Sequence, residues 1–442
     1  MSLTAPGRAD ATMLFRNARL ADGRVRDVRV DGETIAAVGE DLDADEIIEA
    51  DGRLLLPGMI DAHVHFREPG FAHKETWATG SRSAAAGGVT TVVDQPNTDP
   101  PTVDGAGFDR KADRAAASLV DYGIDGGVTA EWAPEELFER PMAALGEVFL
   151  ADSTGEMGID ADRFETAVER AAAADVTVTV HAEDAALFDD DALPAGDGPT
   201  GRAADADAWS AYRTAEAELA AVERAGEVAR RYDADVHVAH TSTPEGADAG
   251  MSCEATPHHL FLSRADLAEL GTYGRMNPPL RSESRRAALF ERLVDGTIDV
   301  VATDHAPHTR AEKEAALPAA PSGVPGVETA LPLLLEAART GELSYERVRD
   351  VTAANVAEIF DLPRKGRIEP GQDADLVLVD ETDPEPIRGG RLHSKCGWTP
   401  FEGRRGVFPG LTTVRGTIVY RDGEFADAQG RNVRSYAAGD DH

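Results

Sequence analysis

The sequence predicts an α/β protein in which a (β/α)8 barrel of the TIM type carries a small β-sandwich domain built from both chain ends. Three observations lead to this prediction. The middle of the chain alternates short apolar runs, typical of buried strands, with long stretches rich in Ala, Glu and Arg, typical of helices. Eight such apolar runs occur. The two ends consist of short strand-like segments separated by turn residues.

The two ends of the chain are predicted to form the small domain. Their expected strands are 13–15, 28–30, 34–38, 375–379, 412–414 and 417–420. A barrel between them would bring the two flanks together as one unit that is split in sequence. Residues 437–442 are expected to be a frayed tail. The expected boundaries are 1–56 and 365–442 for the small β domain, and 57–364 for the barrel.

The barrel is predicted from its repeated βα pattern. One strand precedes His63, and the other seven are expected at 89–93, 124–128, 148–150, 176–180, 236–239, 253–256 and 298–302. Helices are expected between or after them at 161–174, 210–231, 283–295 and 328–340. In such barrels the functional groups lie at the carboxyl ends of the strands, so the residues that follow each strand deserve separate inspection.

The charge of the chain is extreme. Its 80 acidic and 44 basic residues give a formal net charge of −36, and only five residues are lysines. A nucleic-acid-binding protein would carry the opposite sign. The acidic residues are spread through segments that are predicted to fold, which indicates a solvated surface suited to a very salty cytoplasm. We therefore expect a halophile, of the kind found among the archaea.

The remaining composition argues against a membrane or secreted protein. No run of 18 apolar residues and no signal-peptide pattern occurs, so we expect a cytoplasmic protein. The two cysteines, Cys253 and Cys396, are too far apart for a metal-binding motif or a disulfide framework.

The first chemical signal is a His-x-His pair at the end of a strand. His63 and His65 follow an apolar strand-like run at 54–60, and at period two their imidazoles project from one face. Two neutral ring nitrogens can then bind one divalent metal ion. Arg67 would lie on the same side and could hold a substrate carboxylate through two hydrogen bonds.

Further polar residues follow other predicted strands. Histidines end the fifth and sixth strands, and an aspartate ends the eighth. A single buried histidine is commonly satisfied by backbone groups, but packing does not explain five such residues at corresponding positions. Together they could hold two metal ions: His63, His65, His181, His240 and Asp304.

With these residues in view, the chain resembles the amidohydrolase superfamily, in its cyclic-amidase branch, and most closely the dihydroorotases. Arg67 favours this group over the allantoinases, which usually carry another polar residue there, and dihydropyrimidinases lack the run 67–70. The matching motifs cover nearly the whole chain in the expected order: 61–70 (DAHVHFREPG), 95–98 (QPNT), 256–260 (TPHHL), 276–281 (MNPPLR), 302–308 (ATDHAPH) and 366–376 (GRIEPGQDADL).

The resemblance implies a zinc-dependent hydrolase with two ions per subunit. The residues at its metal positions would bind the first ion through His63, His65 and Asp304, and the second through His181 and His240. The residues at its substrate positions are Arg67, Asn97, Asn277 and His308.

The resemblance also implies a reaction. It is the reversible cyclisation of N-carbamoyl-L-aspartate to L-dihydroorotate in de novo pyrimidine (UMP) synthesis. Arg67 and Asn97 would bind the substrate carboxylate through a charged fork and an amide donor. Asp304 would take a proton from the attacking water and give it to the departing ring nitrogen, or would act only as a metal ligand. A homodimer is compatible with the family, and the sequence does not decide the oligomeric state.

One position departs from the family. Many members bridge the two metals with a carboxylated lysine at the start of the fourth strand, but no lysine occurs between Lys111 and Lys313. Glu147 aligns with the missing lysine and supplies a carboxylate on a shorter stem. The alternatives are Asp152, a few residues further on, and a site without a bridge that holds one zinc ion.

Other functions stay open at this stage. A substrate panel would separate a dihydroorotase from an allantoinase or another cyclic-amide hydrolase. A catalytically silent scaffold is a third possibility, although silent relatives usually lose metal ligands. The remaining histidines are expected to be structural or solvent-exposed, with a supporting role possible only for 258 and 259: His73, His237, His258, His259, His305, His393 and His442.

Overall fold

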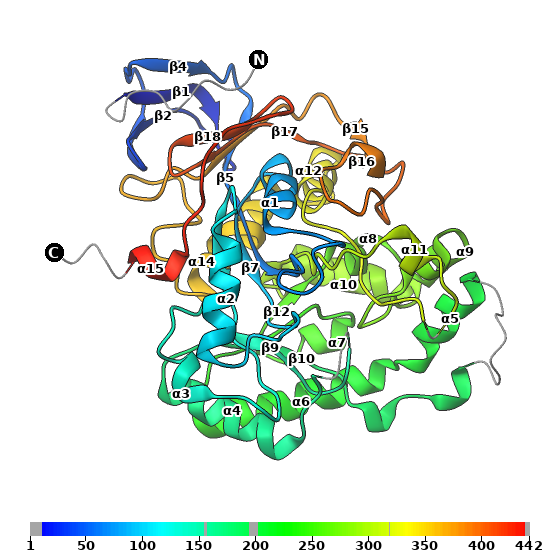
Figure 1. Ribbon diagram of the computed structural model, residues 1–442. Helices are drawn as coiled ribbons and strands as arrows, with labels where there is room; N and C mark the ends of the chain where they lie inside the picture. The colour runs from blue at the N-terminus through cyan, green and yellow to red at the C-terminus, as the bar shows by residue number, and fades with distance from the viewer. Residues whose placement is uncertain (1–10, 154–156, 194–201, 318, 438–442) are drawn as a thin grey trace.

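The structure, a computed structural model, describes residues 11–153, 157–193, 202–317 and 319–437 (Figure 1). Within these residues, eight parallel strands surround the centre of the larger domain in two hydrogen-bonded sets. The strands are β6 (Met59–Val64), β7 (Val89–Asp94), β8 (Asp121–Ile124), β9 (Leu145–Phe149), β10 (Val178–His181), β11 (Val236–Val238), β12 (Ser252–Ala255) and β13 (Val300–Val301).

The two sets of strands close into a barrel. A parallel bridge from Gly126 to Leu145 joins the end of β8 to β9. A second bridge, from Val64 to His305, joins β6 to the segment after β13. The expected (β/α)8 barrel is therefore confirmed, and the polar residues that follow the strands all lie at one end of it.

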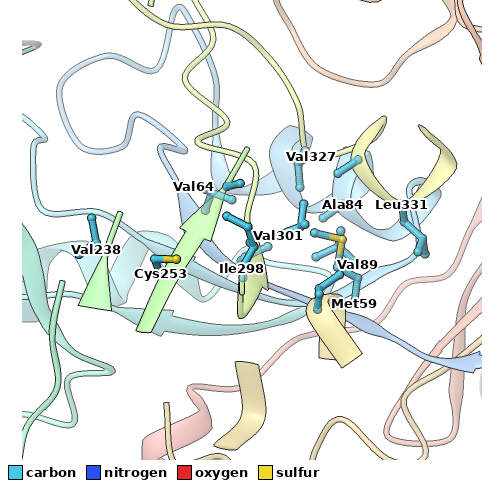
Figure 2. Packing of buried hydrophobic residues seen from close by; sticks show 14 of the residues in the cluster. Met59, Val64, Ala84, Val89, Val238, Cys253, Ile298, Val301, Val327 and Leu331 are labelled. Atoms are coloured by element: carbon cyan, nitrogen blue, oxygen red, sulfur yellow. The ribbon is translucent and has the colours of Figure 1, made fainter. Parts of the chain in front are cut away.

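The barrel wall is buried on both faces because parallel strands are covered by helices outside and filled by side chains inside. Figure 2 shows part of the core, in which Met59, Val89, Val238, Cys253 and Val301 pack together. Each of these five side chains is buried. The burial of Cys253 agrees with its expected role as a small core residue.

Helices lie between and after the strands, and three of the four expected ranges match closely. The main ones are α1 (Trp77–Ala86), α2 (Gly105–Ala115), α4 (Ala161–Ala173), α5 (Arg202–Tyr212), α6 (Ala215–Tyr232), α10 (Glu283–Asp295) and α12 (Ala330–Thr340). The helix expected at 210–231 begins later, at Ala215, because Thr214 caps it by accepting the backbone N–H of Ala217. The shorter helices are α3 (Pro134–Leu137), α7 (Pro244–Ala247), α8 (Pro257–Phe261), α9 (Leu267–Leu270), α11 (Arg310–Lys313), α13 (Tyr345–Arg349), α14 (Asn355–Ile359) and α15 (Val433–Ala437).

The small domain joins strands from both chain ends in one nine-stranded sheet (Figure 1). Phe15, Val28, Leu55, Leu376 and Leu411 pack in its own core, so the sheet encloses apolar residues from both ends as expected for a sandwich. Its strands are β1 (Thr12–Arg19), β2 (Val25–Asp31), β3 (Thr34–Gly39), β4 (Glu46–Glu49), β5 (Leu54–Pro57), β14 (Leu376–Val379), β17 (Pro409–Val414), β18 (Thr417–Arg421) and β19 (Glu424–Phe425). A separate two-stranded ribbon consists of β15 (Glu385–Pro386) and β16 (Arg405–Gly406).

The apolar run at 54–60 is not one strand. It divides at Gly58 into β5 of the small domain and β6 of the barrel. A Cβ atom on Gly58 would lie 2.2 Å from the side chain of Thr90, so any larger residue there would force Thr90 to move. The apolar pattern could not reveal this division, because both halves are buried.

The C-terminal part of the chain also returns to the barrel. Trp398 joins a cluster beside Met276 and Leu280, and Asn432 forms a parallel bridge to Tyr122 of β8. Residues 438–442, most of the predicted tail, lie outside the described residues. None of the helices in the described part of the chain has the length and hydrophobicity needed to cross a membrane.

Candidate active site

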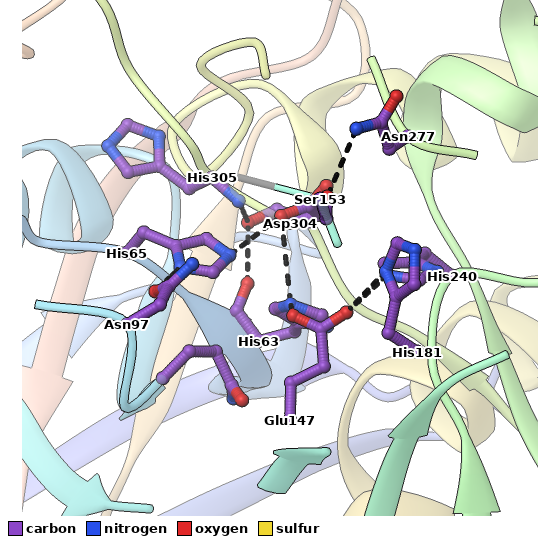
Figure 3. Close-up of polar contacts among 12 residues, drawn as sticks. His63, His65, Asn97, Glu147, Ser153, His181, His240, Asn277, Asp304 and His305 are labelled. Atoms are coloured by element: carbon purple, nitrogen blue, oxygen red, sulfur yellow. Dashed lines mark hydrogen bonds and ion pairs between the residues drawn. The ribbon is translucent and has the colours of Figure 1, made fainter. Parts of the chain in front are cut away.

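The carboxyl ends of the barrel strands bring six of the predicted residues together (Figure 3). His63 lies in β6, Glu147 in β9, and His181 ends β10. The other three follow strands directly or within a few residues: His65, His240 and Asp304. His240 and Asp304 have positive φ angles of 35° and 45°, a backbone conformation that is uncommon for residues other than glycine.

The first group of candidate ligands is the one formed by His63, His65 and Asp304. Their ligand atoms all lie within 4.8 Å of one another. The Asp304 carboxylate oxygen Oδ1 is 2.9 Å from His65 Nε2 and 3.6 Å from His63 Nε2. All three residues are buried. The spacing predicted from the His-x-His motif is therefore realised in space.

Glu147 lies between this group and the remaining two histidines. Its Oε2 atom is 3.3 Å from His63 Nε2. Its Oε1 atom is 2.9 Å from His181 Nδ1 and 2.6 Å from His240 Nε2. Asp152, the other candidate bridge, is exposed, and its carboxylate accepts the backbone N–H of Gly158.

Outer acceptors fix the orientation of three histidine rings. Glu254 Oε1 is 2.7 Å from His63 Nδ1, and Asn97 Oδ1 is 2.7 Å from His65 Nδ1. Glu183 Oε2 is 2.8 Å from His181 Nε2. In each neutral ring, one nitrogen donates its N–H to an acceptor outside the cluster. The other nitrogen therefore faces inward with a lone pair.

These lone pairs face carboxylate oxygens, an arrangement that only a cation makes favourable. His63 Nε2 is buried and has no hydrogen-bond partner within the described structure. A neutral imidazole nitrogen and a carboxylate oxygen are also the donors that zinc and related divalent ions accept. The residues present thus fit a metal ion, and the outer acceptors are the partners that metal-bound histidines usually have.

The charges at the centre favour a cation as well. Burial lowers the pKa of His63, but the carboxylates of Glu254 and Glu147 outweigh it and raise this pKa well above its usual value. Burial opposes ionisation of Glu147, yet His240 and His63 hold its pKa well below the usual range. The site therefore attracts positive charge, and a divalent ion satisfies it without protonating the ligands.

A cavity opens beside the cluster. Eight predicted residues line it: His65, Arg67, Asn97, Glu147, His181, His240, Asn277 and Asp304. His63 and His308 do not line it, and His308 lies behind Arg67, with its Nε2 atom 3.3 Å from Arg67 Nη2. Burial lowers the pKa of Arg67 to about 10, which leaves it charged at neutral pH.

His308 is held as one tautomer. Its Nδ1 atom lies 3.1 Å from the Lys74 ammonium, which can only donate. Its Nε2 atom lies 2.8 Å from the Ser322 carbonyl oxygen, which can only accept. Burial and the neighbouring cations Arg67 and Lys74 hold the pKa of His308 well below its usual value, so the ring stays neutral.

The structure shows the surroundings of three histidines that were not expected to bind metal. His237 is buried between Glu254 and Phe360. His259 supports the loop that carries Asn277, because its Nε2 donates to the Pro278 carbonyl at 2.9 Å. His258 Nε2 is buried without a hydrogen-bond partner among the described residues.

Sequence reasoning assigned no role to three residues that bind predicted site residues: Glu183, Glu254 and Trp209. The contacts of Glu254 and Trp209 join distant parts of the chain, and no motif marks them. The histidine followed two residues later by a glutamate at the end of β10 was the only local signal for Glu183. Asn97 was expected to bind substrate, which stays a prediction, and in the structure its Oδ1 atom orients His65.

Comparisons with known proteins give the family of the chain. The sequence pattern of the amidohydrolase family matches residues 54–419. The chain is 67% identical to the dihydroorotase of Halobacterium salinarum over 95% of this chain and 99% of that protein. It is 42% identical to the dihydroorotase of Methanosarcina acetivorans over 95% of each chain.

Solved structures show the same fold. The L-hydantoinase (dihydropyrimidinase) of Arthrobacter aurescens superimposes with a TM-score of 0.89 at 28% identity, over 96% of this chain and 98% of that one. The likeness to a protein of Halobacterium also agrees with the acidic surface expected for a halophile. The chain therefore belongs to the amidohydrolase family of metal-dependent hydrolases and, within it, to the dihydroorotases.

Proposed function

We propose that this protein catalyses the reversible cyclisation of N-carbamoyl-L-aspartate to L-dihydroorotate. The observation that carries the proposal is a buried arginine beside a histidine and carboxylate cluster in one cavity. The similarity to the Halobacterium salinarum dihydroorotase supports it. A cyclic amide without a carboxylate would leave the Arg67 guanidinium without a charged partner from the ligand.

The groups that face the cavity beside the cluster are suited to an anionic substrate. Arg67 offers its guanidinium. The Oδ1 atom of Asn97 already accepts a hydrogen bond from His65, so the amide N–H groups remain for the ligand. A carboxylate bound at this end would place the ring amide toward Asp304 and Glu147.

We infer that the metal is zinc and that each subunit binds two ions. His63, His65 and Asp304 would hold one, His181 and His240 the other, and Glu147 would bridge them through its two oxygens. When bound, the metals polarise the amide carbonyl and lower the pKa of water. The contacts of the two Glu147 oxygens, one with His63 and the other with His181 and His240, support the bridge. The exposed position of Asp152 argues against the alternative.

Asp304 is proposed to move the proton. Burial alone would raise the pKa of its carboxyl group, but the neighbouring histidines His65 and His63 hold it below the usual value. The carboxylate is therefore ionised at neutral pH and can accept a proton from the attacking water. It lines the cavity, from which it can return that proton to the ring nitrogen.

The division into residues 1–56, 57–364 and 365–442 is also part of the proposal, and the change from β5 to β6 at Gly58 supports the first boundary. The homodimer and the cytoplasmic location stay predictions. A competing activity on allantoin or hydantoins would use the same cluster, so the substrate decides between them.

The test is cyclisation of N-carbamoyl-L-aspartate by the purified protein in molar KCl, followed by the ultraviolet absorbance of the ring amide. We expect turnover that disappears with a chelator and returns with zinc. Absence of turnover in a folded, metal-loaded sample, together with activity on allantoin or a hydantoin, would overturn the proposal. Metal analysis of Glu147→Ala tests the bridge, because two bound ions and normal activity in this variant would contradict it.

A further inference from the structure

The amide of Asn277 has an unusually complete set of partners. Its Oδ1 atom accepts the indole N–H of Trp209 at 2.8 Å and the hydroxyl of Ser322 at 3.2 Å. Its Nδ2 atom donates to the hydroxyl of Ser153 at 3.1 Å (Figure 3). An amide oxygen has two lone pairs and an amide nitrogen two hydrogens, so one N–H remains without a partner from these residues.

Trp209 is the group that decides this orientation. A hydroxyl such as that of Ser153 or Ser322 can donate or accept, so neither would prevent the amide from turning over. The indole N–H can only donate, and the atom facing it must therefore be the amide oxygen. If the Asn277 amide turned over, two N–H groups would face each other.

We propose that Trp209 is a positioning residue that fixes the Asn277 amide as a hydrogen-bond donor toward the substrate. The inference rests on the proposed function for the identity of that substrate. Its consequence for specificity is that the ligand group facing Asn277 is a carbonyl or carboxylate oxygen. A ligand with an N–H group at this place would meet the donor and bind poorly.

The position of Trp209 is itself determined by charged neighbours. The guanidinium carbon of Arg275 lies 3.7 Å from the centre of its ring, and that of Arg213 lies 5.7 Å from it. Arg213 also binds Glu183, with Nε 2.9 Å from Oε2, and Glu183 holds His181. Arg213 therefore contacts both Trp209, which holds the Asn277 amide, and Glu183, which holds the candidate metal ligand His181.

The experiment compares Trp209→Phe with a matched control. The change keeps an aromatic ring and removes the N–H group. Trp132→Phe is the control, because Trp132 is also partly buried and its indole nitrogen has no partner within the described structure. In Trp209→Phe we expect the KM for N-carbamoyl-L-aspartate to rise about three- to tenfold with kcat nearly unchanged, since a neutral hydrogen bond orients a binding group. Trp132→Phe should change neither constant.

A double-mutant cycle separates positioning from a general loss of structure. In an Asn277→Ala background, Trp209→Phe should cause no further rise in KM, because the amide that it orients is gone. Bound metal and thermal stability should match those of the parent protein. An unchanged KM in Trp209→Phe would overturn the inference. So would a double variant whose increase in KM equals the product of the increases in the two single variants.

A spectroscopic measurement tests the contact without turnover. The chain has four tryptophans, so its indole N–H groups give few nuclear magnetic resonance signals. The Trp209 signal, identified by its loss in Trp209→Phe, should exchange with solvent faster in Asn277→Ala. If the wild-type protein lacks turnover but shows this change, the proposed function fails and the fixed amide stands. If the exchange rate does not change, the positioning role is refuted whatever the activity.

Discussion

The outer acceptor Glu254 should control metal affinity although it is not among the proposed ligands. Its Oε1 atom lies 2.7 Å from His63 Nδ1 and 3.1 Å from the backbone nitrogen of His240. It therefore holds two of the proposed ligands from one buried position. Burial would raise the pKa of Glu254, but the charge of His63 lowers it strongly, so the carboxylate is ionised.

The expected effect of Glu254→Gln follows from the loss of this charge. A hydrogen bond to a charged group contributes about 1.5–3 kcal/mol, against about 0.5–1.5 kcal/mol for a neutral one. The difference is about 1 kcal/mol for each of the two bonds, or about 2 kcal/mol in total. Since 1.4 kcal/mol corresponds to a factor of ten, zinc affinity should fall about thirtyfold.

The assay is a zinc titration of the metal-free protein in competition with a chromogenic chelator. Glu218→Gln is the matched control, because Glu218 is equally buried and accepts the backbone N–H groups of Ser242 and Thr243, neither of which is a proposed ligand. Unchanged zinc affinity in a folded Glu254→Gln protein would refute the reasoning. An equal loss in Glu218→Gln would show that the effect is one of general stability.

Three further predictions concern the whole molecule. Burial lowers the pKa of His258 to about 3, so this side chain stays neutral in the folded protein but is protonated in the unfolded chain below about pH 6.5. The free energy of unfolding therefore decreases as the pH falls below about 6.5. Between pH 6.5 and 5.0 this costs up to about 2 kcal/mol, and denaturant unfolding of His258→Phe should show a smaller loss than the parent protein. Burial raises the pKa of Cys253 to about 12, so iodoacetamide at pH 8 should label this thiol only after unfolding, as mass spectrometry will show. Because the chain carries a net charge of −36, its Tm should drop when KCl is reduced from about 2 M to about 0.1 M, where screening is weak. A Tm that does not change with the KCl concentration would contradict the halophilic interpretation.

The sequence predicted the barrel and the inner residues because both follow from local patterns. His63 and His65 reveal themselves by alternation at a strand end, and His181, His240 and Asp304 by the same position after later strands. The rule that functional residues follow the barrel strands requires only the repeated βα pattern, and it applies without information on which strands are neighbours.

The outer residues could not be found in this way, because their contacts join distant parts of the chain. Glu254 is 191 residues from His63, and Trp209 is 68 residues from Asn277. Trp398, in the segment assigned to the small domain, donates its indole N–H to the His308 carbonyl at 2.8 Å. None of these pairs has a spacing that a strand or helix period would predict.

Glu147 leads to a last prediction about the missing lysine. A carboxylated lysine forms from an amine and carbon dioxide, so enzymes that use one depend on bicarbonate when the metal site is rebuilt. Here the carboxylate belongs to the side chain itself, and its oxygens already lie within 3.3 Å of ring nitrogens of His63, His181 and His240. The proposed bridge needs no longer stem, because β9 places Glu147 in the barrel interior, next to the candidate ligands.

We therefore expect metal-free protein to regain full activity with zinc in buffer freed of carbon dioxide. Glu147→Lys should regain activity only when bicarbonate is added. The measurement is the initial rate of N-carbamoyl-L-aspartate cyclisation after reconstitution with and without bicarbonate. A bicarbonate requirement in the parent protein would mean that another group completes the site and that Glu147 does not replace the lysine.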